Sequence, residues 1–243
     1  MVRKSPLKSN LSISAFFPCY NDAGSIALVV QDAYKILKGI SKDFEIIVVD
    51  DGSGDESREI LERLKNKIQQ LKLVFHKKNK GYGGALRSGF KTASKEYIFY
   101  TDGDGQYDPS EISKLVERLE NDVEVVQGYK IKRSDQWYRL IIGRLYHYST
   151  KIMFGLRIKD VDCDFRLIKK KAIDSIDLEN NSGVICVELV KKLQDKGFKF
   201  VEVGVHHYPR LHGHSQFFNY RRILKTMIEL VILWFNLVLF KKK

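Results

Sequence analysis

Four short apolar runs, each followed by turn residues and then by the spacing of an amphipathic helix, constrain the fold of this chain most. They occupy residues 11–17, 45–49, 73–75 and 97–100. The run at 45–49 is β-branched and shows no alternation of polar and apolar residues, which is typical of a parallel strand buried on both faces. Because strands and helices alternate with short turns throughout residues 11–128, the sequence predicts an α/β fold with a doubly wound, mostly parallel sheet flanked by helices.

The turn after the run at 97–100 is the strongest candidate for a functional site. It carries Asp102, Asp104 and Gln106 with glycines between them. Ligands bind at the carboxyl ends of the strands in open α/β sheets, and hard oxygen ligands suit a divalent cation that bridges protein and phosphate. The turn therefore predicts a site for Mg²⁺ or Mn²⁺ and a nucleoside diphosphate. A turn whose aspartates cap a helix starting at Ser110 explains the stretch alone equally well.

A second acidic pair, Asp50 and Asp51, follows the run at 45–49 and should reach the same edge of the sheet. A carboxylate at this place can accept hydrogen bonds from a ribose or a nucleobase. The alternative is helix capping, with Ser53 or Asp55 starting a helix that continues through Leu71.

A glycine-rich turn at residues 79–84, preceded by lysines, follows the run at 73–75. Glycines let a backbone approach a ligand closely, and lysines beside a helix N-terminus suit a phosphate. Considered alone, the stretch is more often an ordinary turn, because it lacks the Gly-Lys-Ser/Thr ending of a Walker loop.

Charge and cysteine content narrow the partners and the compartment. Lysine and arginine number 42 against 30 acidic residues, a formal charge of +12, which favours an anionic partner such as nucleic acid, phospholipid or a phosphorylated substrate. Acidic residues at the predicted site edge and the lack of a nucleic-acid motif argue against nucleic acid. The three cysteines are widely spaced, and the apolar run at 11–17 is too short for a signal-peptide core, so we expect reduced thiols in a cytoplasmic protein.

Four ordered motifs carry a resemblance to a known family. They are Pro18-Cys-Tyr-Asn-Asp22, Val48-Val-Asp-Asp-Gly-Ser53, Asn79-Lys-Gly-Tyr-Gly-Gly-Ala85 and Asp102-Gly-Asp-Gly-Gln106. In this order and spacing the chain resembles the inverting family 2 glycosyltransferases with a GT-A fold, and within them the polyprenyl-phosphate sugar synthases of the dolichyl-phosphate mannosyltransferase type. Two later segments, Asp160-Val-Asp-Cys-Asp-Phe-Arg-Leu167 and a loop with Arg210, Gly213 and Ser215, extend the resemblance.

The resemblance implies a role for individual residues. Asp22 stands where the family usually has glutamate, Lys130 where it has arginine, and Gln216 where it has lysine. The implied nucleotide-sugar site comprises Pro18, Tyr20, Asp22, Val48, Asp50, Asp102, Gly103, Asp104, Lys130, Arg210 and Gln216. The implied metal ligands are Asp102, Asp104 and Gln106; the implied catalytic residues are Asp102, Asp104 and Arg166; and the implied acceptor-phosphate contacts are Lys130, Arg139 and Arg166. A solvated basic face is the alternative for the segment from Lys130 onward, and a salt bridge to a nearby aspartate is the alternative for Arg166.

The C-terminal segment predicts an appendage at residues 219–243 to a GT-A domain at residues 1–218. It is basic at first, apolar from 227 to 240 except for Glu229 and Asn236, and ends in three lysines. Fourteen residues rise ~21 Å as a helix, which is short of the ~30 Å hydrocarbon core. The pattern favours a helix lying in the membrane interface, with a membrane-protein partner or a homo-oligomer contact as the alternative.

These observations predict a metal-dependent enzyme at the cytoplasmic face of a membrane. It would transfer a sugar from a nucleotide-sugar donor, GDP-mannose or a UDP-hexose, to a polyprenyl phosphate such as dolichyl or undecaprenyl phosphate, with inversion. The first alternative is transfer to a hydroxyl of a glycan or lipid, for which Asp162 or Asp164 would be the general base. The second alternative is a basic nucleic-acid-binding protein.

Overall fold

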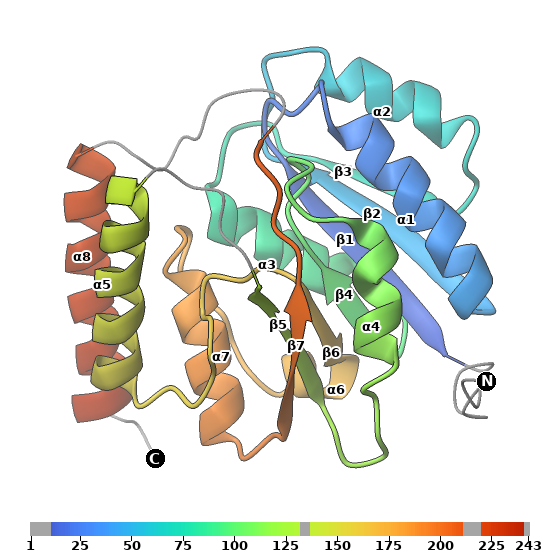
Figure 1. The fold of residues 1–243 in the computed structure, drawn as a ribbon. Helices are drawn as coiled ribbons and strands as arrows, with labels where there is room; N and C mark the ends of the chain where they lie inside the picture. The colour runs from blue at the N-terminus through green and yellow to red at the C-terminus, as the bar shows by residue number, and fades with distance from the viewer. Residues whose placement is uncertain (1–10, 132–136, 211–219, 241–243) are drawn as a thin grey trace.

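The computed structural model describes residues 11–131, 137–210 and 220–240, without the side chains of 137–142 and 220–223. Within these ranges the strands form a seven-stranded sheet in the order β3-β2-β1-β4-β6-β5-β7 (Figure 1). The strands are β1 (Ser12–Cys19), β2 (Asp43–Asp50), β3 (Leu71–Phe75), β4 (Tyr97–Tyr100), β5 (Val125–Lys130), β6 (Arg166–Lys169) and β7 (Phe200–Val205). The helices are α1 (Ile26–Ile40), α2 (Ser57–Lys65), α3 (Tyr82–Thr92), η2 (Pro109–Glu111), α4 (Ile112–Val116), α5 (Trp137–Phe154), α6 (Lys170–Asp174), α7 (Ile185–Asp195), α8 (Tyr220–Trp234) and the π-helical η3 (Phe235–Leu239).

The strands of the alternating region pair in parallel, which confirms the predicted parallel sheet. β1 pairs in parallel with both β2 and β4, and β2 pairs in parallel with β3. All the strands that precede the candidate turns therefore end at one edge. Two helix predictions were too long: α2 ends at Lys65, so that Leu71 begins β3, and the helix expected at 110–121 is the short pair η2 and α4.

Strand β6 is the element that the sequence did not reveal. It lies between β4 and β5 and is antiparallel to both, while β5 and β7 are parallel to each other. It has four residues and both of its ends are charged, Arg166 and Lys169, so it lacks the apolar run that marks the other central strands. All four residues are nevertheless buried.

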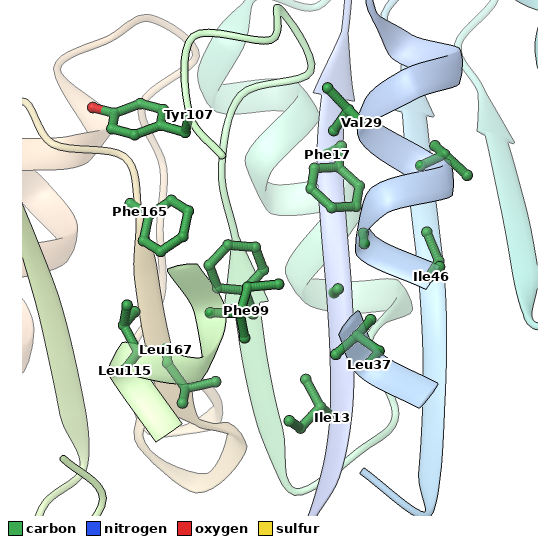
Figure 2. Packing of buried hydrophobic residues seen from close by; sticks show 14 of the residues in the cluster. Ile13, Phe17, Val29, Leu37, Ile46, Phe99, Tyr107, Leu115, Phe165 and Leu167 are labelled. Atoms are coloured by element: carbon green, nitrogen blue, oxygen red, sulfur yellow. The ribbon is translucent and has the colours of Figure 1, made fainter. Parts of the chain in front are cut away.

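Helices cover both faces of the sheet, as expected of a doubly wound fold. One cluster of buried side chains joins α1, α2 and α4 to the sheet, and a second joins α3, α6 and α7 to the opposite face. Figure 2 shows part of the first cluster, in which Phe17 of β1 lies near Val29 of α1, and Phe99 packs against Phe165 with ring centroids 4.8 Å apart. The core is thus continuous from the parallel half of the sheet to the antiparallel strand β6.

Helix α8 packs beside α5 at one side of the domain (Figure 1). Leu230 and Leu233 are buried against Phe154 of α5 and Val187 of α7, and the Trp234 indole N–H donates to the carbonyl of Met153. The charge that interrupts the apolar segment also faces the domain, because the Ser182 hydroxyl donates to the Glu229 carboxylate at 2.5 Å. In the described part of the chain, no helix combines the length and the apolar character needed to cross a membrane.

Candidate functional site

The carboxyl ends of β1, β2 and β4 bring the predicted turns together. The N–H of Gly103 donates to the carbonyl of Pro18 at 3.1 Å, and the N–H of Asp51 donates to the carbonyl of Cys19 at 2.9 Å. A Cβ atom on Gly103 would lie only 2.7 Å from the Pro18 oxygen. The glycine therefore lets the turn after β4 lie directly against the end of β1.

The first acidic group at this edge, Asp50 and Asp51 at the end of β2, is saturated by protein donors; we call it the β2 pair. The Asp50 carboxylate is fully buried and accepts from the N–H groups of Gly52 and Ser53 and from the Arg58 side chain, at 3.1, 2.9 and 3.1 Å. A ribose contact of Asp50 stays a prediction, and in this structure the carboxylate that would make it is committed to the turn.

Asp51 of the β2 pair belongs to a buried hydrogen-bonded chain. Its Oδ1 lies 2.6 Å from His76 Nδ1 and accepts from the Lys80 N–H at 2.8 Å. The other ring nitrogen of His76 lies 2.8 Å from the Ser88 hydroxyl of α3. Asp51 thus ties the end of β2 to β3, α3 and the glycine-rich turn, which is a structural task.

The second acidic group has few donors; we call it the acidic quartet, and it comprises Asp22, Asp102, Asp104 and Asp164. Burial and then the charge of Asp104 raise the pKa of Asp22 to about 6. Burial, followed by the charges of Asp164 and Asp104, raises the pKa of Asp102 well above its usual range, although the Tyr82 hydroxyl donates to it at 2.7 Å. These carboxylates repel one another, and a cation among them would relieve that repulsion.

Two arginines supply positive charge to the quartet. Arg210, just after β7, places its guanidinium 2.5 Å from Asp104 Oδ2 and 3.7 Å from Asp22 Oδ1. Arg166 pairs with Asp164 at 2.7 Å. Asp104 also accepts from the backbone N–H of Gln106 at 3.0 Å. The quartet is therefore only partly neutralised by the protein itself.

The donor atoms of the quartet fit Mg²⁺ or Mn²⁺ bound together with a phosphate. Carboxylate oxygens are hard ligands, and such cations are commonly held by one or two carboxylates while substrate phosphates and water complete the shell. In the part of the chain that the structure describes, no group of three or more His, Cys, Asp or Glu side chains could hold a metal ion by itself. Of the predicted ligands, Asp102 and Asp104 lie in the quartet, whereas the Gln106 amide nitrogen donates to the Tyr208 carbonyl at 3.1 Å.

The turn after β1 provides the exposed part of the predicted base and ribose pocket. Tyr20 is 39% exposed, and Asn21 adopts a left-handed backbone with φ of 57°. The N–H of Asn21 donates to the Ser53 hydroxyl at 2.9 Å, and this bond joins the turn to the one after β2. Pro18 and Val48 lie in the strands and are buried, and their contact with a base or ribose stays a prediction.

The glycines of the third turn allow a close approach to another segment of the protein, whereas the sequence predicted a close approach to a ligand. A Cβ atom on Gly81 or Gly83 would lie 2.3 or 2.2 Å from the carbonyl oxygen of Asn181 or Asn180. These glycines accommodate the segment at residues 178–182, whose Asn181 carbonyl accepts from the Gly83 N–H at 2.9 Å. The close backbone approach is thus to another part of the protein, while Tyr82 between the two glycines reaches Asp102.

Arg166 is buried and does not face an open acceptor site. Its side chain has 0% relative exposure, donates to Gln127 and to the Tyr100 hydroxyl, and donates to the Val161 carbonyl at 2.6 Å. The alternative left open by the sequence, an ion pair with a nearby aspartate, is the arrangement observed with Asp164. A direct contact of Arg166 with an acceptor phosphate stays a prediction.

The other predicted phosphate contacts are only partly described. Lys130 ends β5, is half-buried, and donates from Nζ to the Asp162 carbonyl at 2.7 Å. Arg139 lies on α5, but its side chain falls outside the described residues, and Gln216 falls outside them altogether. Sequence reasoning missed Tyr82; its signal was a hydroxyl-bearing aromatic between the glycines of the third motif.

In open α/β sheets, ligands bind outside the carboxyl ends of the strands, and this is where the acidic turns of this protein lie. The family model described as Glycosyl transferase family 2 matches residues 14–177, more than half of the chain, and the chain belongs to that family.

Two curated relatives from bacteria are similar in sequence to this chain. The undecaprenyl-phosphate 4-deoxy-4-formamido-L-arabinose transferase of Aeromonas hydrophila is 28% identical over 221 residues, which cover 90% of this chain and 66% of the relative. The protein of the same name from Enterobacter sp. (strain 638) is 27% identical over 220 residues, with coverages of 90% and 66%. The chain thus spans just under two thirds of the length of these relatives.

Solved structures confirm the GT-A type of fold. Glucosyl-3-phosphoglycerate synthase from Mycobacterium tuberculosis in complex with phosphoglyceric acid superposes with a TM-score of 0.69 at 15% identity, covering 93% of this chain and 79% of that one. The same enzyme in complex with Mn²⁺, uridine diphosphate and glucosyl-3-phosphoglycerate gives 0.66 at 17% identity, with coverages of 90% and 80%. At this identity the likeness speaks for the fold alone.

Proposed function

We propose that this protein transfers a sugar from a nucleoside-diphosphate sugar to a polyprenyl phosphate, with inversion, at the cytoplasmic surface of a membrane. The observation that carries the proposal is the acidic quartet, in which Arg210 lies 2.5 Å from Asp104 and 3.7 Å from Asp22, and Arg166 lies 2.7 Å from Asp164. Family membership supports the reaction type, and the undecaprenyl-phosphate transferases among the relatives support the acceptor class. A GDP-mannose or UDP-hexose donor fits the same edge.

The donor would bind across the ends of β1 and β4. Tyr20 is exposed beside the turn and offers a face for the base, while Asp102 and Asp104 would hold Mg²⁺ or Mn²⁺ against the diphosphate. Such a cation neutralises the charge that develops on a departing nucleoside diphosphate. Tyr82 positions Asp102 through its hydroxyl, and Gly103 keeps this turn close to β1.

A phosphate acceptor needs orientation more than deprotonation. A phosphate monoester is ionised near neutral pH, so catalysis rests on holding it in line with the anomeric carbon beside an anionic donor. Lys130 at the end of β5 and Arg139 at the start of α5 are the cations proposed for this task. Arg166 would act at one remove, by fixing Asp164.

The same ion pair argues against the alternative of a hydroxyl acceptor. A general base must be free to accept a proton from the attacking group. Asp164 instead accepts from the Arg166 guanidinium at 2.7 Å and from the Cys186 thiol at 3.1 Å. Both contacts use Oδ1, and the Arg166 guanidinium stabilises the charged carboxylate, which supports a structural role for Asp164. A base role for Asp162 or Asp164 remains the alternative.

The membrane would bind the outer face of α5 and α8, which we call the apolar face. Its exposed side chains are Leu145, Tyr148 and Ile152 on α5, and Leu224, Met227, Ile228, Val231, Ile232 and Phe235 on α8 and η3. Arg144 and Lys225 are exposed next to them, and an open apolar groove of about 590 Å³ runs between the two helices. Apolar area with a basic border suits a surface of anionic lipid.

Vesicle sedimentation tests this surface with a matched control. Leu224→Asp combined with Ile232→Asp should abolish binding to vesicles that contain phosphatidylglycerol, because both side chains are exposed on the apolar face. Leu28→Asp, an equally exposed leucine on α1, should bind as the unaltered protein does. Equal binding by the double variant and the control would place the membrane contact elsewhere.

A donor-by-acceptor matrix tests the reaction itself. Purified protein is given nucleotide sugars with short-chain polyprenyl phosphates or with hydroxyl acceptors, and release of nucleoside diphosphate is followed. Release that depends on both a polyprenyl phosphate and a divalent cation is expected. Turnover with hydroxyl acceptors alone would overturn the proposed acceptor.

A further inference from the structure

The segment that follows β7 is fastened onto the turn that carries Asp104. The N–H of His206 donates to Glu111 at 2.9 Å, and its ring Nδ1 lies 2.6 Å from the same carboxylate. Two residues on, the N–H of Tyr208 donates to the Gln106 carbonyl at 2.8 Å, and the Gln106 amide donates back to the Tyr208 carbonyl at 3.1 Å. This two-way bond fixes the start of the segment beside the quartet.

Arg210 is thereby delivered between two buried carboxylates. The side chains of Asp104 and Asp22 are 7% and 10% exposed, whereas that of Arg210 is 26% exposed. The arginine thus enters from the solvent side and its guanidinium contacts Asp104 at 2.5 Å. A guanidinium so placed occupies the charge position, among hard oxygens, that a divalent cation would take.

We propose that Arg210 is an exchangeable counter-cation of the acidic quartet: it holds Asp104 and Asp22 while the donor site is empty and leaves them when a cation arrives together with a diphosphate. The inference rests on the proposed function, since it assumes that the quartet receives a metal and a nucleotide. It goes beyond that function by assigning Arg210 two alternating partners.

Arg210 should weaken the binding of a metal ion alone and strengthen the binding of a metal ion together with a nucleotide. A cation alone must compete with the bound guanidinium, so its apparent affinity falls by the fraction of molecules in which Arg210 has withdrawn. A cation with a diphosphate offers the displaced guanidinium a new anionic partner, so exchange becomes favourable. Cation and nucleotide therefore reinforce each other's binding, as reciprocal coupling requires.

Titration with Mn²⁺, followed by the electron paramagnetic resonance signal of the free ion, separates this proposal from a permanent structural bridge. In the absence of nucleotide, Arg210→Gln should bind Mn²⁺ at least about threefold more tightly than the unaltered protein. With GDP or UDP present, the same variant should bind the nucleotide and the metal more weakly. Arg210→Lys, which keeps the charge without the fork, should fall between the two.

A matched control and a reference variant keep the outcomes distinct. Lys191→Gln removes one positive charge from the surface of α7, where it pairs with Asp195, and should leave Mn²⁺ affinity unchanged. Unaltered or weaker Mn²⁺ binding by Arg210→Gln without nucleotide, while the unaltered protein binds metal and nucleotide normally, overturns the exchange and leaves the proposed function standing. If Asp104→Asn binds Mn²⁺ as well as the unaltered protein does, the quartet is not the metal site, and both proposals fail.

Discussion

The two acidic groups at the edge of the sheet contain the same residue type and differ in the number of donors around them. The β2 pair is buried with a full set of partners: two backbone N–H groups and Arg58 for Asp50, and His76 and the Lys80 N–H for Asp51. In the acidic quartet, Asp104 is buried and the other three are half-buried; each carboxylate has one or two donors and has other carboxylates as neighbours.

The surroundings of an aspartate therefore help to distinguish a structural carboxylate from one that can bind a ligand. Burial alone penalises a carboxylate, and donors or a cation must offset that penalty. Where the donors come from the chain, as in the β2 pair, the carboxylate fixes a turn. Where carboxylates lie beside one another with only one or two donors each, as in the quartet, an incoming metal ion can supply the remaining positive charge.

The largest expected effect comes from removing a charge of the quartet. Asp104→Asn should lower turnover by at least ~100-fold, because a preorganised electrostatic stabiliser is lost. Its thermal midpoint should stay close to that of the unaltered protein, since the substitution also relieves repulsion among the carboxylates. Chelation of divalent cations should abolish turnover as well. Full activity in the variant would contradict the assignment.

The corresponding substitution in the β2 pair, Asp51→Asn, should lower the stability of the fold and leave turnover nearly unchanged. Asp51→Asn keeps the shape of the side chain but weakens the bonds from His76 and Lys80, and we expect a loss of about 2 kcal/mol in the free energy of unfolding. Urea unfolding measures that loss, and turnover of the folded fraction should change little. A stable but inactive variant would erase the distinction between the two groups.

A substitution of Arg166 tests whether its ion pair with Asp164 serves the structure of the protein or the binding of a substrate. Arg166→Lys loses the planar fork that donates to Gln127, Asp164 and Val161, and we expect a loss of about 2 kcal/mol with donor and acceptor use falling together. Thermal midpoint, nucleotide affinity and acceptor kinetics are measured on one variant. A stable protein in which only the apparent acceptor constant rises would restore the direct phosphate contact.

The smallest effect concerns a third carboxylate that is rich in donors, Glu188 of α7. Burial opposes its ionisation, but bonds from Lys192 and Asn180 outweigh burial and lower its pKa. A pKa that is lower in the folded state adds stability above the unfolded value near 4.5, and that stability is lost as the pH falls through the folded value. Glu188→Gln should therefore cost about 1 kcal/mol at neutral pH, and the difference from the unaltered protein should shrink in acid.

The sequence predicted the half of the fold whose local signals agree with its tertiary role. The runs that became β1, β2 and β4 are mostly apolar, and their turns carry the aspartates, so both the strands and their shared edge could be inferred. Strand β6 was not predicted because Arg166 is charged yet buried. Hydrogen bonds to Gln127, Tyr100, Asp164 and Val161 offset the cost of that burial. Long-range pairing of this kind leaves no local pattern.

At the site, the sequence motifs predicted which residues lie at the edge of the sheet, but not which partners their side chains have. The motif spacing placed Asp50 and Asp51 at this edge, but it did not indicate that both carboxylates would accept hydrogen bonds from the protein itself. The glycines at 81 and 83 indicated a close approach, but not that its partner would be the segment around Asn181. Likewise the apolar tail predicted a helix, while its division into a face packed on α5 and α7 and an exposed face depends on a tertiary contact.

Calorimetric titration of GDP and UDP, with and without Mn²⁺, into the unaltered protein, Asp104→Asn and Asp51→Asn tests the central claim most directly. The account predicts Mn²⁺-dependent binding of at least one nucleotide to the unaltered protein, retention of that binding in Asp51→Asn, and its loss in Asp104→Asn. Mn²⁺-dependent binding that survives in Asp104→Asn and disappears in folded Asp51→Asn would contradict it, because the metal and diphosphate would then depend on the β2 pair.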